Sequence, residues 1–446
     1  MARDARFFWS IGRCFVRLSR VESGKNKSRN NPSGSSRWTW PALLVAFAFG
    51  TAAAAAGDWP QILGPHRNGI ADGERLAAGL PDAGPRVVWQ RTVGSGYSGP
   101  AVSSGRLILF HRQDARAIVL ALDARTGKEL WQVPFPTQYA SGIAPDDGPR
   151  CVPVIAGGSV FLVGAGGDVH CLAFDTGKTR WSRDLFRELG APEGYFGAGS
   201  TPIVEDGKLL LNVGGRGAGI VALSVNDGST IWKATDEAAS YSSPIAATID
   251  GRRQVIFVTR LNVVSLDPNN GDVRFRFPFG MRGPTVNAAN PVLLDNRLFV
   301  TASYGVGAEL ATIGPGGAKQ VWANDDVLSS QYTTSVVRGG VLFGIDGRQD
   351  AGVARLRAID PRDGRVLWTQ EGFGTATLIL ADDKLLIMKT DGTLVLADPV
   401  AAEYRELGKS QLFPTIVQAL PALADGYFYA RDTRTLKCFD LAAKKP

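Results

Sequence analysis

VHCLAFDTGKTRW, at residues 169–181, is the clearest copy of a phrase that the chain repeats. Side chains alternate along a strand up to Asp175, a tight turn follows at Thr176 and Gly177, and the return strand carries Trp181. The other copies are ALDARTGKELW at 121–131, ALSVNDGSTIW at 222–232, AIDPRDGRVLW at 358–368, SLDPNNGDVRF at 265–275 and ATIGPGGAKQVW at 311–322. Self-similarity at intervals of tens of residues predicts an architecture built from repeated units.

A full unit contains four strand-like runs, as in residues 199–232, where Asp206 and Gly207 form a hairpin turn between the first two. First strands recur eight times, near Pro100, Pro153, Pro202, Pro244, Pro291, Ser335, Ala376 and Pro421. A lone fourth strand around Trp89 precedes them, and the chain ends after residues 438–440 without one. Pairing these two segments closes a ring and removes its open edges. We therefore predict an all-β fold at residues 87–446, an eight-bladed β-propeller of four-stranded antiparallel blades that is closed by the N-terminal outer strand.

One slot in the fourth strand holds six of the seven tryptophans that follow residue 56, namely Trp89, Trp131, Trp181, Trp232, Trp322 and Trp368. An indole in this slot is expected to cover the turn of its own blade and to pack on the next blade. We interpret these tryptophans as structural residues.

Residues 1–56 are predicted to be a signal peptide region, with basic residues up to Arg37 and an apolar run that ends in small residues at Ala54 and Ala56. We place cleavage after Ala56 and interpret part of the long basic stretch as an upstream extension from a misplaced start. The apolar run is short for a spanning helix, so an uncleaved anchor is the weaker alternative. Residues 57–86 form an N-terminal extension before the propeller. The predicted location is the periplasm or the outside of a bacterial cell, with no stable membrane span after cleavage.

The formal net charge of +7 comes from residues 1–56, which hold nine Lys or Arg and two acidic residues. Residues 57–446 hold 40 basic and 40 acidic side chains. A basic surface that follows a phosphate backbone is therefore not indicated, and nucleic acid is not a predicted partner.

The cysteines after the leader, Cys151, Cys171 and Cys438, are odd in number. Cys151 and Cys171 belong to strands two apart in one unit, about 9.5 Å from each other and beyond disulfide reach. We interpret all three as small buried residues. His66, His111 and His170 are scattered in the sequence, which predicts surface or turn positions rather than a metal site. His170 lies in a repeat strand, where the other repeats have ordinary side chains.

The phrase DxxTGKxxW, the eight first strands and the DWPQ opening at 58–61 resemble the exported propellers with pyrroloquinoline-quinone-like repeats. That family includes quinoprotein dehydrogenases, the outer-membrane protein-assembly scaffold lipoprotein and many bacterial proteins of unassigned function. The resemblance covers residues 57–446 and implies the propeller fold. For the scaffold the likeness is in fold only, because the lipid-attachment Cys is missing at the predicted cleavage site.

The resemblance implies pyrroloquinoline quinone as a cofactor only for the dehydrogenase branch. Those enzymes carry vicinal cysteines over the cofactor and a calcium site with a catalytic Asp, whereas no two cysteines here are adjacent and no DxDxDG calcium loop occurs. GSGYSG at 94–99 matches a dinucleotide-binding pattern, but Pro100 and a strand follow instead of a helix. No GxSxG nucleophile elbow occurs either. The residues themselves predict no cofactor, no metal site and no catalytic residue.

Loops of unequal length point to one face of the ring. The connections from second to third strands and from fourth to first strands share that face, and they include 132–150, 182–199 and 278–289. Variable loops on a rigid scaffold are the usual place for binding groups. Near the axis on this face we expect a funnel with aromatic walls and polar donors, suited to a sugar, a peptide or a quinone-like ring. Its predicted residues are Tyr97, Arg150, Tyr195, Tyr241, Asn287, Asn290, Gln331, Tyr332 and Gln418.

These observations favour an exported, non-catalytic binding or assembly scaffold, expected to be a monomer, with a protein, small-molecule or saccharide ligand on the loop-bearing face. The second hypothesis is a pyrroloquinoline-quinone-dependent oxidoreductase. A third, a carbohydrate-binding or carbohydrate-active propeller, requires paired carboxylates that face the funnel, and the candidates are Asp146 with Asp147 and Asp325 with Asp326.

Overall fold

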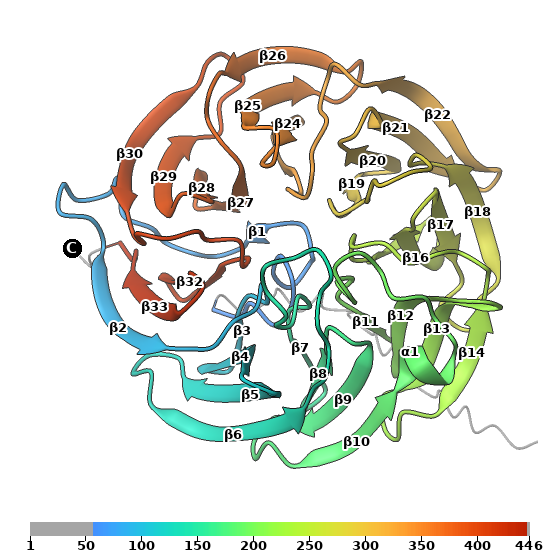
Figure 1. Cartoon of the computed structure of the whole chain (residues 1–446). Coiled ribbons are helices and arrows are strands. Elements are labelled where there is room, and N and C mark those ends of the chain that lie inside the picture. The colour runs from blue at the N-terminus through green and yellow to red at the C-terminus, as the bar shows by residue number, and fades with distance from the viewer. Residues whose placement is uncertain (1–56, 444–446) are drawn as a thin grey trace, which may run out of the picture. The chain divides into compact units, whose positions relative to one another are not determined.

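A computed structural model describes residues 57–443 and places eight blades around one axis (Figure 1). The predicted signal peptide region lies outside the described residues. Every blade is an antiparallel meander whose first strand is innermost. The prediction of an eight-bladed all-β propeller is confirmed.

The first four blades follow one another in the chain. Blade 1 consists of β3 (Ala101–Ser103), β4 (Arg106–Gln113), β5 (Arg116–Asp123) and β6 (Glu129–Pro136). Blade 2 consists of β7 (Val154–Ala156), β8 (Ser159–Val163), β9 (Asp168–Ala173) and β10 (Thr179–Asp184). Blade 3 consists of β11 (Ile203–Glu205), β12 (Lys208–Gly215), β13 (Ala218–Ser224) and β14 (Thr230–Ala234). Blade 4 consists of β15 (Ile245–Ile249), β16 (Arg252–Val258), β17 (Asn262–Leu266) and β18 (Val273–Pro278).

The remaining blades complete the ring. Blade 5 consists of β19 (Val292–Leu294), β20 (Arg297–Ala302), β21 (Gly307–Gly314) and β22 (Gly317–Asn324). Blade 6 consists of β23 (Val336–Arg338), β24 (Val341–Arg348), β25 (Val353–Asp360) and β26 (Arg365–Gln370). Blade 7 consists of β27 (Ala376–Ala381), β28 (Lys384–Lys389), β29 (Thr393–Asp398) and β30 (Arg405–Gln411). Blade 8 consists of β31 (Ala422–Ala424), β32 (Tyr427–Arg431), β33 (Thr435–Asp440) and the N-terminal β2 (Arg86–Thr92).

Blade 8 closes the ring with strands from both ends of the propeller. β2 pairs antiparallel with β33, and Trp89 lies opposite Cys438. The predicted closure is thereby confirmed. Because β2 supplies the missing outer strand, β33 presents no open edge at the seam.

The indoles of the repeated slot stabilise the contacts between successive blades. Trp131 of β6 donates its Nε1–H to Phe174 O of blade 2 at 3.1 Å. A Cβ at Gly177, whose φ is +70°, would lie 2.6 Å from the same ring. The equivalent pairs are Trp89–Ala124, Trp181–Val225, Trp232–Pro268, Trp322–Pro361 and Trp368–Val400, at 2.9–3.1 Å. The expectation that each indole covers the turn of its own blade is corrected, because the outer strand projects the ring over the turn of the next blade.

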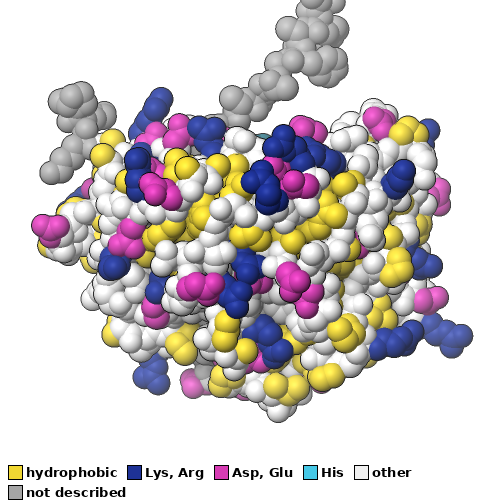
Figure 2. Space-filling view, turned by 90° about the horizontal axis from the view of Figure 1, so that it is seen from above, with side chains coloured by type: hydrophobic (Ala, Val, Ile, Leu, Met, Phe, Trp, Pro, Cys, Tyr) yellow, Lys and Arg dark blue, Asp and Glu magenta, His cyan; other side chains and the backbone are white. Residues whose placement is uncertain are grey.

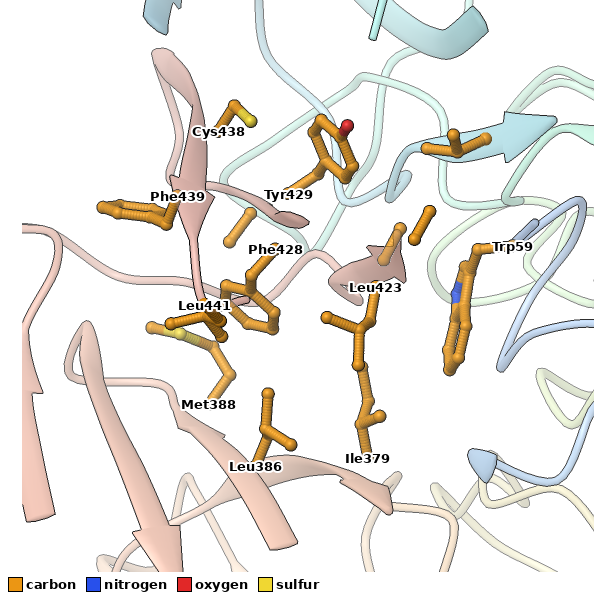
Figure 3. Close-up of a cluster of buried hydrophobic side chains, with 14 of the residues drawn as sticks. Trp59, Ile379, Leu386, Met388, Leu423, Phe428, Tyr429, Cys438, Phe439 and Leu441 are labelled. Atoms are coloured by element: carbon orange, nitrogen blue, oxygen red, sulfur yellow. The ribbon is translucent and has the colours of Figure 1, made fainter. Parts of the chain in front are cut away.

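The core consists of the layers between neighbouring blades. In β5 every residue from Ala117 to Leu122 is buried because both faces of the strand meet another blade, whereas β6 alternates exposed and half-buried residues. The largest cluster joins blades 7, 8 and 1, with Leu386 and Met388 packed near Phe428 and Trp59 beside Leu423 (Figure 3).

The N-terminal plug, residues 58–71, crosses the middle of the ring (Figure 1). Trp59 exchanges two backbone hydrogen bonds with Val102 of β3, and β1 (Ile70–Ala71) pairs in parallel with β27. Arg67 is 2% exposed and donates to Thr201 O and Pro202 O, just before β11, both at 2.9 Å. The plug therefore contacts the inner strands, or the residues just before them, in several blades.

One face of the ring, hereafter the loop face, carries the long connections. The longest run from β6 to β7, from β10 to β11 and from β18 to β19, and the second of these contains α1 (Leu185–Glu188). Around the side of the ring, acidic and basic side chains are intermixed (Figure 2). Within residues 57–443 no helix is long and apolar enough to cross a bilayer.

Candidate functional site

The segments that lead into the inner strands line an open cavity of about 210 Å³ on the loop face, hereafter the axial cavity. Its lining includes six of the nine predicted funnel residues, namely Tyr97, Arg150, Tyr241, Asn290, Tyr332 and Gln418. Each of them lies shortly before the inner strand of a different blade. Ile62 of the plug and Leu420 belong to one apolar cluster that also contributes to the lining. The structure thus brings these six residues together, and their binding role remains a prediction.

Arg150 stacks between two tyrosines on one side of the cavity. Its guanidinium carbon lies 5.4 Å from the ring centre of Tyr97 and 5.3 Å from that of Tyr139, within cation–π range. One of its end nitrogens donates to Asp146 O at 2.6 Å and the other to Gly148 O. The Nε atom is buried without a hydrogen-bond partner among the described residues. The loop therefore holds the cation in place while part of its donor capacity stays unused.

Asn290 belongs to a chain of hydrogen bonds that links successive inner strands around the axis. The backbone N–H of Thr201 donates to Ser243 Oγ at 2.9 Å, and that of Ser243 donates to Asn290 Oδ1 at 2.7 Å. The N–H of Asn290 in turn donates to Thr334 Oγ1 at 3.0 Å. The neighbouring positions in this chain use hydroxyl oxygens, whereas Asn290 brings an additional amide nitrogen. Asn290 is 4% exposed, and its Nδ2 has no hydrogen-bond partner within residues 57–443.

Other hydroxyl and amide groups in the walls of the cavity are held by hydrogen bonds to nearby loop residues. Tyr332 donates its hydroxyl to Gln349 Oε1 at 3.0 Å, and Gln418 Nε2 donates to the same oxygen at 3.1 Å. Tyr241 accepts a hydrogen bond from Phe196 N at 2.7 Å. Burial raises the pKa of Tyr241 and of Tyr332 to about 12 and also raises the pKa of Tyr97. All three phenols are therefore neutral at neutral pH.

Three predicted funnel residues lie elsewhere. Asn287 is 1% exposed and points its Nδ2 at backbone carbonyls, among them Thr259 O at 2.8 Å. Gln331 binds the hydroxyl of Tyr304 and the backbone of Gln349 beside the cavity. Tyr195 is 43% exposed and lines a second cavity of about 350 Å³ on the loop face. In each of these loops the backbone path, rather than the distance from the strand, determines where the side chain points.

The sequence analysis missed Ile62, Tyr139 and Gln349. Ile62 belongs to the extension, where the DWPQ opening gives no sign that the segment crosses the channel. Tyr139 and Gln349 come from a long loop and a hairpin tip of the loop face. Their position in variable loops was the only available signal.

The carboxylates proposed for carbohydrate chemistry hold loops together. Asp146 accepts from the N–H of Gly96 at 2.9 Å and from that of Gly148 at 2.7 Å, and Asp147 accepts from Ser141 N at 2.7 Å. Asp325 pairs with the hydroxyl of Ser329. Among the described residues that line the axial cavity, none is acidic.

Cys151, Cys171 and Cys438 are buried free thiols, which confirms their interpretation as small buried residues. Burial raises the pKa of Cys151 and Cys438 to about 12. Within residues 57–443 no group of three or more His, Cys, Asp or Glu is placed to hold a metal ion.

The expected surface or turn position of the histidines is wrong for two of them. His111 and His170 are 3% and 7% exposed because they lie on strands packed between blades. His170 bonds Ser182 Oγ at 2.8 Å and Asp168 at 2.7 Å, and its ring stacks on Phe135. His111 accepts from Gly94 N at 3.0 Å. His66 is exposed, as expected.

Comparison with known proteins gives a family match over residues 115–370, to the family described as outer membrane protein assembly factor BamB. The outer membrane protein assembly factor BamB of Burkholderia pseudomallei is 24% identical over 378 residues, which cover 74% of this chain and 88% of that protein. The quinoprotein alcohol dehydrogenase PedH of Pseudomonas putida is 34% identical, but over only 26% of this chain and 19% of its own length. Among solved structures, the quinohemoprotein alcohol dehydrogenase of Comamonas testosteroni is similar with a TM-score of 0.63 at 14% identity, covering 87% of this chain and 81% of that one. The last likeness concerns the fold alone.

Proposed function

The chain belongs to the pyrroloquinoline-quinone-like repeat propeller family that is described as outer membrane protein assembly factor BamB, and from this premise we propose that it is an exported, non-catalytic binding or assembly scaffold. It acts in the periplasm or outside the cell, as a monomer whose loop face docks a protein partner. The observation that carries the proposal is the concentration of long loops on one face of a rigid ring.

Exposed apolar side chains on the long loops support a protein partner. Ile143 is 62% exposed, Tyr195 43% and Met281 41%, and all three belong to connections between fourth and first strands. Large apolar side chains that stay in water on binding loops favour contact with another protein surface. The outer strands also expose apolar residues, such as Leu130 at 44% and Val321 at 48%.

Site-specific photo-crosslinking in the producing bacterium tests this proposal. A benzophenone amino acid replaces Ile143 or Tyr195 on the loop face, and Leu130 or Val321 on the rim as equally exposed controls. We expect both loop-face positions to yield an adduct with the same protein and the rim positions to yield none. Equal adducts from the rim, or none from the loop face, would contradict the proposal.

The residues present do not fit pyrroloquinoline quinone, so we derive no oxidoreductase step. The axial cavity of about 210 Å³ is smaller than the roughly 300–1,000 Å³ of pockets for drug-sized ligands. None of the described residues that line this cavity is acidic, whereas a calcium site beside the quinone would need carboxylate oxygens. Addition of pyrroloquinoline quinone and calcium to the purified protein is expected to give neither cofactor absorbance nor dye reduction with alcohols or sugars.

A further inference from the structure

The first residues of the plug are firmly held on the face opposite the loop face. Asp58 accepts hydrogen bonds from Ser103 Oγ at 2.9 Å and from Ser104 N at 2.8 Å, in the turn between β3 and β4. Trp59 is 1% exposed and bonds β3 through its backbone. Gly57, directly before these two residues, is therefore fixed in position.

A carboxylate lies against Gly57. A Cβ built on Gly57 would lie 2.1 Å from Asp425 Oδ1, so a side chain in this conformation would require the carboxylate to move. Asp425 belongs to the turn between β31 and β32, and Leu423, two residues before it, lies beside Trp59 (Figure 3). The buried carboxylate of Glu74 accepts from the backbone N–H of Asp425 at 2.9 Å and from that of the next residue at 2.6 Å. The turn that carries the Asp425 carboxylate is thereby fixed.

The two oxygens of this carboxylate have different neighbours. Asp425 Oδ2 accepts from Arg125 Nη2 of blade 1 at 3.2 Å. Oδ1 is the oxygen nearest to the Cβ position of Gly57. The Asp425 side chain is 50% exposed, so the carboxylate is open to solvent and can accept a second cation.

The charge on the Gly57 nitrogen depends on processing. In the uncut chain this nitrogen is an uncharged amide. Ala54 and Ala56 match the small residues at a signal peptidase site. Hydrolysis of the bond between Ala56 and Gly57 adds the hydroxyl of water to the Ala56 carbonyl carbon and leaves an ammonium group on Gly57. Rotation about the Cα–C bond of Gly57 then carries this nitrogen toward the built Cβ position, within hydrogen-bonding distance of Asp425 Oδ1.

We propose that the Asp425 carboxylate binds the α-ammonium group of a mature chain that begins at Gly57. This assignment rests on the export that the proposed function includes, and it does not depend on what the loop face binds. The ion pair joins the plug to blade 8 and, through Arg125, to blade 1. It holds the amino terminus on the face opposite the loop face and leaves the loop face free for a partner.

Mass spectrometry of the protein purified from the producing bacterium gives the first test. The N-terminal peptide should start at Gly57. An exported chain that starts at another residue would overturn the assignment and leave the exported scaffold standing. A chain that stays in the cytoplasm with residues 1–56 attached would contradict both proposals.

Competitive acetylation over a pH series then measures the pKa of the α-amino group in the purified mature protein. A neighbouring carboxylate stabilises the ammonium form and raises this pKa. Asp425→Asn should therefore lower the pKa of the α-amino group by about 0.2–0.7, the range expected for an exposed ion pair. The same pKa in the parent and in Asp425→Asn would overturn the assignment.

Asp295→Asn is the matched control. Asp295 is exposed and occupies the equivalent turn of blade 5 with a φ of +55°, close to the +53° of Asp425. Asparagine tolerates a positive φ, so both variants should keep the thermal midpoint near that of the parent. Asp295→Asn removes the same charge away from Gly57 and should leave the α-amino pKa unchanged. An equal fall in the two variants would show a response to overall charge, and the assignment to Asp425 would be wrong.

Discussion

Substitution of Gly177 by alanine tests whether the indoles hold the blades together. Gly177 has a φ of +70°, and an added Cβ would lie 2.6 Å from Trp131 Cε3 and 2.8 Å from Cδ2. The left-handed backbone conformation costs a non-glycine residue about 1–2 kcal/mol. Displacing a packed indole adds about 1–3 kcal/mol of overpacking. The expected loss of unfolding free energy is therefore about 2–5 kcal/mol.

Gly207→Ala is the control, because Gly207 has a φ of +74° with nothing within 4 Å of an added Cβ. It should lose only the backbone cost of about 1–2 kcal/mol. Both variants are compared with the parent by chemical denaturation followed by backbone circular dichroism, a signal that does not depend on the mutated tryptophan. The double variant Trp131→Ala/Gly177→Ala should lose less than the sum of its single variants, because removing the ring removes the clash. Equal losses for Gly177→Ala and Gly207→Ala, or strict additivity in the double variant, would refute the role assigned to the indole.

Three further predictions follow from the seam, the buried histidine and the thiols. Gln90 in β2 and Lys437 in β33 lie opposite each other, so cysteines introduced at both positions should form a disulfide on oxidation. Mass spectrometry of the digested protein detects this disulfide. If the ring were open at this seam, both thiols would stay free. Burial lowers the pKa of His111 to about 4 in the folded protein, whereas the pKa of an unfolded histidine is about 6.5. The unfolding free energy should therefore fall as the pH drops from about 6.5 toward 4, by about 3 kcal/mol in all. Unfolding free energies at pH 7 and pH 4.5 should show this loss in the parent and a smaller one in His111→Asn. Burial raises the pKa of Cys151 and Cys438 to about 12. Iodoacetamide at pH 8 should therefore leave both thiols unmodified in the folded protein and modify both in urea. Labelling of either thiol without urea would contradict this burial.

The sequence predicted the blades because each blade repeats the same local solution. Pro202 and the Asp206–Gly207 turn were enough to locate β11 and β12, and the repeat of this pattern, with other residues in some copies, located the other inner strands. The seam was predictable because an orphan strand at each end leaves an edge that pairing removes. The turn that each indole covers was harder to predict, because the pattern of a strand does not say whether its side chain packs on its own blade or on the next one.

The candidate site was predictable only in part. Six residues before inner strands line the axial cavity, yet Asn287, three positions before Asn290, turns its amide to backbone carbonyls instead. Both are asparagines in one loop, so residue type and spacing could not separate them. Tyr195 lies in a connection that forms α1, which no repeat elsewhere in the chain foreshadows.

The sequence by itself determined the number of blades, the order of their strands and the closure of the ring, because these follow from local periodicity and from the pairing of edges. Only the tertiary structure decided that residues 58–71 cross the middle of the ring, that Ile62 lines the axial cavity and that Asn290 Nδ2 is buried without a hydrogen-bond partner among the described residues. These features arise from contacts between the plug and a blade or between two blades, such as Arg67 with Thr201, 134 residues apart, and Asn290 with Ser243, 47 residues apart. No local pattern records such contacts, since they depend on which groups remain unpaired once the ring has closed.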